Sequence, residues 1–133
     1  MAPTSRPDDD FSFVAQWLGP LTYDQKIMPA NNPGATALEK GTVLAVVTDP
    51  ANASFNQLQQ FDPASTVAGV NTIYAIAGQD IAAGATAVST KVVIRNAAVN
   101  SAKIVWPAGA TATQIAAWNL ALEAKNINVI DGV

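Results

Sequence analysis

Few side chains in this sequence of 133 residues could support catalysis or metal binding. Histidine and cysteine are both absent, which removes the commonest general base, the commonest metal ligand and every thiolate site. Without histidine, a nucleophilic serine would need a lysine as its base. Ser101 and Lys103 are two positions apart, and on a predicted strand their side chains share one face. A polar position at a sheet edge explains this pair better than catalysis does.

The acidic residues are not arranged as a catalytic or metal-binding group. Residues 8–10 are three consecutive aspartates, and they lack the alternating spacing that wraps a Ca²⁺ ion. Asp62, Asp80 and Glu123 have no carboxylate partner nearby in the sequence, so a glycosidase-type pair is not indicated. Glycine-rich phosphate loops are also absent. We therefore expect no enzymatic activity, no cofactor, no metal site and no small-molecule substrate.

The tryptophans are the remaining candidates for ligand binding, because an indole ring can stack on a sugar. This keeps a β-rich host-surface or glycan-binding module open as an alternative function. Trp118 lies on the apolar face of a predicted helix, and Trp106 precedes Pro107 at the end of a predicted strand. Packing inside the domain is therefore the favoured role for both side chains.

The composition excludes two classes of partner. Lysine and arginine occur singly in a chain of net charge -3, and without a basic stripe we expect no nucleic-acid binding. No apolar run approaches the roughly 20 residues that span a bilayer, and the acidic, proline-containing N-terminus does not resemble a signal peptide. We therefore expect no membrane association. Only 13% of the residues are charged, so the chain either buries surface against a partner or is a weakly soluble monomer.

The apolar runs predict a mainly β domain of the α+β class. The stretch from Thr86 to Pro107 holds two of these runs, and we interpret it as two strands joined by a polar loop. Thr111 or Thr113 is expected to cap one helix in the C-terminal half, and Lys125 is expected to lie in its last turn. The predicted strands are residues 42–48, 72–77, 92–94, 104–106 and 127–130. The unbroken apolar run from Val43 to Val47 predicts that the first of them is buried on both faces. The predicted core residues are Val43, Leu44, Ile94, Val105, Trp106, Trp118 and Leu122.

Residues 1–34 have the character of an extended N-terminal arm. Phe11 and Phe13 alternate as on a strand, whereas Val14, Trp17 and Leu18 recur at helical spacing, so a strand and a short helix are both compatible with this segment. Proline and glycine interrupt the arm, and it cannot close a core of its own. Either it packs on its own domain, or it docks on another chain by strand addition or aromatic anchors.

Four segments follow one another in an order that resembles a known family. They are LEKGTVLA at 38–45, GVNTIYAIA at 69–77, AVSTKVVIRNAAV at 87–99 and AKIVWP at 102–107. In this order they resemble the head decoration proteins of tailed bacteriophages, the family of the phage lambda capsid-stabilising protein D. The resemblance covers residues 36–130, and its most specific piece is the predicted strand that ends at Trp106-Pro107, followed by a helix and a short apolar strand.

The resemblance implies a small mixed β barrel-like or tulip domain over residues 35–133, with the arm over residues 1–34. It implies a non-enzymatic homotrimer on the outer surface of the virion capsid, made in the host cytoplasm and bound to the major capsid protein after the shell expands. Deletion of residues 1–34 is then expected to leave a folded trimer that no longer binds capsids. The expected capsid-binding residues of the arm are Phe11, Phe13, Val14, Trp17, Leu18 and Tyr23.

Overall fold

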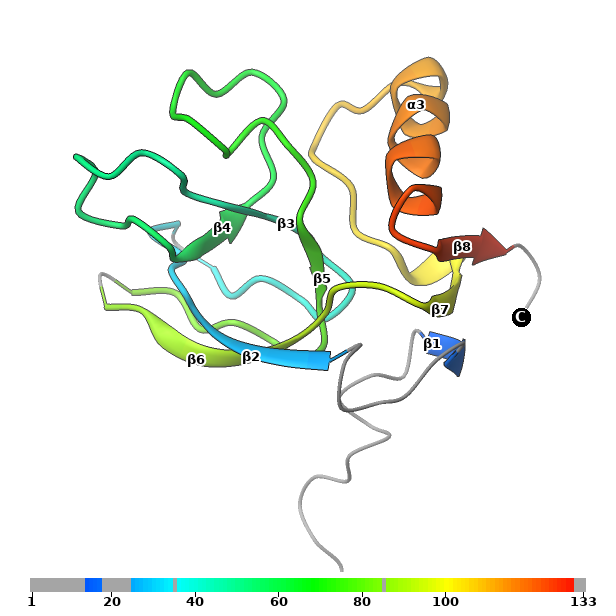
Figure 1. Cartoon of the computed structure of the whole chain (residues 1–133), viewed down its shortest axis with the longest axis horizontal. Coiled ribbons are helices and arrows are strands. Elements are labelled where there is room, and N and C mark those ends of the chain that lie inside the picture. The colour runs from blue at the N-terminus through cyan, green and yellow to red at the C-terminus, as the bar shows by residue number, and fades with distance from the viewer. Residues whose placement is uncertain (1–13, 18–24, 35, 85, 131–133) are drawn as a thin grey trace, which may run out of the picture.

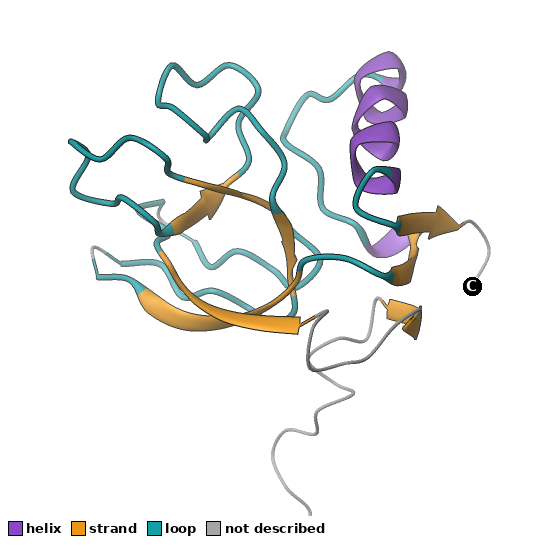
Figure 2. Cartoon of the chain, in the orientation of Figure 1, coloured by secondary structure: helices purple, strands orange, loops and turns teal. Residues whose placement is uncertain are grey.

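The computed structural model describes residues 14–17, 25–34, 36–84 and 86–130. They form a closed five-stranded β-barrel beside a three-stranded sheet that carries one α-helix (Figures 1 and 2). This confirms the predicted α+β, mainly β class. The elements are β1 (Val14–Trp17), β2 (Gln25–Ala30), β3 (Val43–Val46), β4 (Leu58–Gln60), β5 (Ala75–Ala77), β6 (Val88–Val93), β7 (Ala97–Asn100), the 3₁₀-helix η1 (Ser101–Lys103), α3 (Ala112–Glu123) and β8 (Ile127–Ile130).

The barrel closes because β2 pairs with strands from both halves of the chain. The strand order is β2-β4-β3-β5-β6, and β6 returns to β2. The β2–β6 ladder is antiparallel and runs from Gln25 opposite Val93 to Ala30 opposite Val88, while β2 meets β4 in parallel where Ala30 lies opposite Leu58. Small and medium-sized side chains fill the interior of this narrow barrel. They are Ala30, Leu44, Leu58, Ala75, Ala77, Ile81 and Val92.

The second core lies between the barrel wall, the three-stranded sheet and α3. Strand β3 serves both cores, because Leu44 points into the barrel while Val43 and Ala45 point into the second cluster. This follows from the two-residue period of a strand, and it confirms the prediction that the apolar run at 43–47 is buried on both faces. Other members of the cluster are Phe61, Ile73, Ile76, Val93, Ala97, Val99, Ile104, Leu122 and Ile127.

Helix α3 begins where the sequence predicted, at a capping box. The Thr111 hydroxyl accepts a hydrogen bond from the Gln114 backbone N–H (3.2 Å), and the Gln114 side chain accepts one from the Thr111 N–H (2.9 Å). Two otherwise unsatisfied donors of the first turn are paired in this way. Lys125 does not lie in the last turn as expected, because the helix ends at Glu123 with Ala124 as its C-cap. Its ammonium lies instead 5.5 Å from the centre of the Tyr74 ring.

The predicted strand pair within residues 86–107 is wrong. Strand β6 belongs to the barrel, whereas the segment expected as a loop contains β7, the central strand of the three-stranded sheet. Residues 104–106 form no strand, and Val105 makes only an isolated bridge to Thr42. Asn96 adopts a left-handed conformation (φ 56°) that turns the chain between the barrel strand β6 and the sheet strand β7. The run AAVN of β7 has too few β-branched residues to be recognised as a strand.

The described part of the predicted arm contains two strands, followed by a loop at residues 31–34. Val14–Trp17 is β1, a strand rather than a helical turn, and Gln25–Ala30 is the barrel strand β2. The first barrel strand therefore begins at Gln25, before the boundary between arm and domain that was predicted after residue 34. Deletion of residues 1–34 would remove one of the five barrel strands, so a test of an independent arm must stop short of Gln25.

The predicted core residues lie at different depths. Val43, Leu44 and Leu122 have at most 1% of their surface exposed. Ile94 is half-buried and packs against the barrel cluster, while Trp106 and Trp118 are half-buried against the second cluster. Val105 is also half-buried.

Candidate functional site

The described portion of the arm joins the three-stranded sheet through β1. Val14 lies opposite Val99, and Trp17 lies opposite Ala97, with an irregularity in register between Val14 and Gln16. Strand β7 is buried along its whole length, and β1 covers one edge of its backbone. Val14 is half-buried and packs against the second core. Val14 therefore marks a fixed point at the edge of this sheet.

The other predicted capsid-binding residues of the arm are only partly placed. Phe11, Phe13, Leu18 and Tyr23 lie outside the described residues. Trp17 is the last residue of β1, and its backbone position is described. The structure thus positions Val14 and Trp17 on one strand and does not test the rest of the set.

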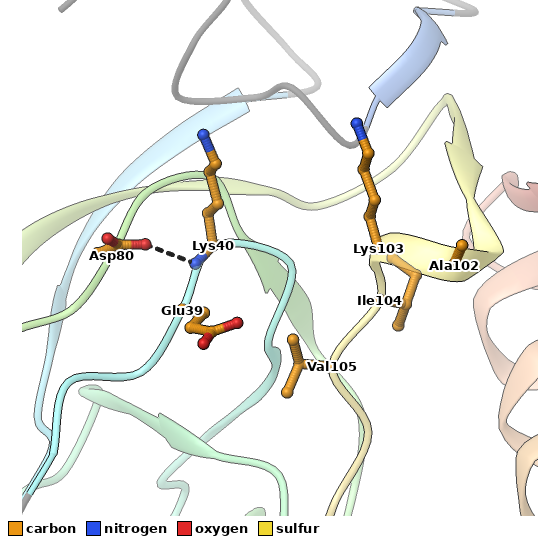
Figure 3. Close-up of a pocket in the computed structure, with 7 residues that line it drawn as sticks. All are labelled: Glu39, Lys40, Asp80, Ala102, Lys103, Ile104 and Val105. Atoms are coloured by element: carbon orange, nitrogen blue, oxygen red, sulfur yellow. Dashed lines mark hydrogen bonds between the residues drawn. The ribbon is translucent and has the colours of Figure 1, made fainter. Parts of the chain in front are cut away.

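A pocket of about 580 Å³ lies between the turn that leads into β3 and the 3₁₀-helix η1 (Figure 3). Backbone hydrogen bonds hold its two walls together, because the Val105 N–H donates to the Gly41 carbonyl (2.9 Å) and the Val43 N–H donates to the Val105 carbonyl (3.2 Å). The lining residues are Glu39, Lys40, Asp80, Ala102, Lys103, Ile104 and Val105. No local sequence pattern indicates this pocket, since its walls are far apart along the chain.

Gly41 sets how closely the two walls of the pocket approach. Its φ of +92° is a conformation that side chains rarely adopt, and a Cβ at this position would collide with the backbone carbonyl oxygen of Lys103. On the barrel side, the Lys40 N–H donates to the Asp80 carboxylate (2.9 Å). Backbone contacts therefore hold the two walls of the pocket together.

The lysines of the pocket point to one side of the molecule. In Figure 3, the side chains of Lys40 and Lys103 both extend away from the pocket floor, toward the side where the blue strand β1 lies. Asp80 lies on the barrel side, held to the backbone of Lys40. The arm strand and two ammonium groups thus share one side of the protein.

The residues that could have done chemistry are not arranged for it. Ser101 and Lys103 lie on η1 and not on a strand, so their spacing of two does not place them on one face. The Asp62 carboxylate accepts a hydrogen bond from the Ala64 N–H (3.0 Å) and closes a turn. In the part of the chain that the structure describes, no three acidic residues, histidines or cysteines come together as a potential metal site.

The two described tryptophan side chains contact each other. Trp106 stacks on Trp118 with ring centroids 5.6 Å apart, and Phe61 meets Trp118 edge-on at 5.2 Å. One face of each indole is therefore covered by protein, which agrees with a packing role. Among the described residues, no helix has the length and apolar character needed to cross a membrane.

The described residues form a mainly β domain in which the N-terminal strand β1 pairs at the edge of a three-stranded sheet. Comparison with known families gives the class: the family model of the bacteriophage lambda head decoration protein D matches residues 21–127. The chain belongs to this family of phage head decoration proteins, which are structural components of the virion capsid and not enzymes. No curated protein matches the chain closely. The match begins within the predicted arm and includes β2.

Proposed function

We propose that this protein binds the outside of the expanded icosahedral head as a homotrimer, at three-fold and quasi-three-fold positions, and stabilises the head against the pressure of packaged DNA. The observation that carries the proposal is the family match, which extends over the barrel, β7 and α3 and ends at the first residue of β8. The major capsid protein is the proposed partner.

The arm supplies the capsid contacts in this proposal. Strand β1 fixes the arm to the sheet edge, so residues 1–13 are the part that extends to the partner, with Phe11 and Phe13 closest to the anchored strand. Aromatic side chains dominate the binding energy of many interfaces. Three arms on one trimer also need only modest affinity each, because linked sites raise the effective concentration of the second and third contacts.

The outer face of α3 supports self-association. Leu120 is 65% exposed, and four alanines near it are exposed as well, namely Ala116, Ala117, Ala121 and Ala124. Glu123 is the only charged residue of α3, Ala112–Glu123. A helix that is apolar on its solvent side as well as its core side is typical of one that is covered in the assembled state. We propose that this face contacts a second copy in the trimer.

Deletion of residues 1–13 tests the proposal, because it leaves β1 and the barrel intact. The truncated protein should unfold at the same temperature as the full chain and should no longer co-sediment with expanded shells of the cognate major capsid protein. Unexpanded shells, which lack the proposed site, serve as the control for the full chain. Undiminished binding by the truncated protein would contradict the role of the arm. Failure of the full chain to bind expanded shells would contradict the proposed function as a whole.

A further inference from the structure

We propose that the outer face of α3 in one copy packs on the outer face of the β2–β6 ladder in the next copy of the trimer. The outer face of the ladder is the side of the barrel wall that carries Ile27, Pro29, Ser89 and Lys91. This inference rests on the proposed homotrimer and adds the surface that receives Leu120. Its basis is the exposure of two large apolar side chains, one on each of these faces.

Ile27 and Leu120 are the most exposed large apolar side chains among the described residues. Ile27 has 67% of its surface exposed and Leu120 has 65%, whereas Phe55 and Val88 follow at 41% and 39%. Neither Ile27 nor Leu120 belongs to a core cluster or packs against one. Burial of a large aliphatic side chain between two copies would remove this apolar surface from water.

A closed trimer needs two different contact surfaces on each copy. In a ring of three, one patch meets a different patch of the neighbour, whereas a patch that meets itself gives a dimer. The two faces lie on different sides of the molecule: in Figure 1 the β2–β6 ladder forms the lower wall of the barrel, and α3 stands at the upper right. One copy therefore cannot join its own two faces, but three copies in a ring can join them in turn.

The charges of the two faces are complementary. Glu123 is the only charged residue of α3, and it lies three positions after Leu120, on the same side of the helix. Strands β2 and β6 contain lysines and no acidic residue, and Lys91 lies directly opposite Ile27. The attraction follows from the sign of each face and does not depend on one exclusive ion pair. Contact between two α3 faces would instead bring like charges together.

The shapes of the two faces also suit each other. The exposed residues around Leu120 are alanines, so the helix backbone can come close to a partner surface. Pro29 lies opposite Ser89 in the ladder, and both are small beside the larger Ile27. A helix that lies on the face of a sheet is one of the standard packing arrangements in proteins.

Cysteine crosslinking tests which faces meet, because the chain contains no cysteine of its own. The variant I27C/L120C should form covalent trimers with a short bismaleimide reagent, since each copy then links to the next. I27C alone and L120C alone should stay monomeric on denaturing gels. The matched control is F55C/L120C, because Phe55 is the next most exposed side chain and lies in the turn before β4, on neither face. It should give no covalent trimers.

Two crosslinking results would overturn the inference. Covalent dimers of L120C alone would show that two α3 faces meet each other. Covalent trimers from F55C/L120C, but not from I27C/L120C, would place Leu120 against a different surface of the neighbour.

A charged substitution gives a second readout that needs no crosslink. I27E brings a carboxylate close to Glu123 of the neighbouring copy, so it should shift the protein from trimer to monomer in light scattering after size-exclusion chromatography. I27A should remain trimeric, and neither variant should change the unfolding temperature, since the side chain is exposed. If I27E stays trimeric while L120E becomes monomeric, the inference is wrong and the α3 contact stands. Co-sedimentation of the unmodified protein with expanded shells, measured in parallel, distinguishes this result from a failure of the proposed function.

Discussion

Trp106 and Trp118 stack with their ring centroids 5.6 Å apart and their planes inclined by 28°. The contact joins the segment after η1 to the middle of α3. Phe61, which follows β4, meets the Trp118 ring edge-on at 5.2 Å. Trp118 therefore contacts two aromatic rings from two other parts of the chain, whereas Trp106 stacks on one ring, that of Trp118.

Removal of Trp118 should cost more stability than removal of Trp106. We expect Trp118→Ala to lower the free energy of unfolding by about 3 kcal/mol and Trp106→Ala by about 2 kcal/mol, since both side chains are half-buried. Urea denaturation at one fixed protein concentration measures both values. The double variant should be less destabilised than the sum, by about 1 kcal/mol of coupling. Strict additivity would show that the stacked geometry contributes nothing of its own.

Gly41→Ala should be strongly destabilising because it combines an unfavourable backbone conformation with a collision. Gly109 separates the two effects: its φ is also positive (+76°), but a Cβ there would meet nothing within 4 Å. Gly109→Ala should therefore cost about 1–2 kcal/mol, and Gly41→Ala more than about 3 kcal/mol. Thermal unfolding of both variants checks the difference. Equal losses would mean that the wall formed by Lys103 moves aside at little cost.

An engineered disulfide between β1 and β7 should form and should leave capsid binding unchanged. Gln16 lies opposite Ala98 in the antiparallel pair, and paired residues at this spacing are within reach of a disulfide. The chain contains no cysteine, so Gln16→Cys with Ala98→Cys gives one defined crosslink. We expect normal binding to expanded shells because residues before Val14 make the proposed contact. Binding that is lost when the crosslink forms and regained on reduction would show that β1 must leave the sheet.

Leu120→Glu should convert the proposed trimer to a monomer. The substitution places a charge in the middle of the apolar outer face of α3, where an unpaired charge in an interface is costly. Leu120 does not contribute to the core because it is 65% exposed, so the thermal stability of the monomer should remain measurable. Light scattering after size-exclusion chromatography gives the mass. Leu120→Ala is the control that keeps the face apolar, and it should remain trimeric. A trimer of unchanged stability in the Glu variant would place the contact elsewhere.

Local sequence signals predicted those elements whose structure depends on nearby residues. The apolar run at Val43 predicted a strand buried on both faces, Thr111 predicted the start of α3, and the run INVI predicted β8. Each of these depends on a period or a cap that lies within a few residues. The family resemblance also proved correct.

The sequence could not predict features that depend on contacts between distant segments. Ala97 and Ala98 are weak strand formers, and they become the centre of a sheet because β1 and β8 pair with them from both sides. Lys40 and Lys103 form one pocket only because Gly41 permits their two segments to approach. The sequence analysis placed Ser101 and Lys103 on one face of a strand, which the 3₁₀ geometry does not support, whereas the position of Lys103 at the pocket became evident only from the structure.

The order of strand pairing has a consequence for synthesis of the protein. Strand β2 pairs with β6, and β1 pairs with β7, although three or more other strands are translated between the members of each pair. Such distant contacts slow folding, since a long loop must close before either ladder forms. On the ribosome, the aromatic arm and two strands with unpaired edges emerge before their partners exist. The barrel can close only near the end of translation, so a prematurely terminated chain that lacks β6 and β7 would be prone to aggregation rather than able to bind a head.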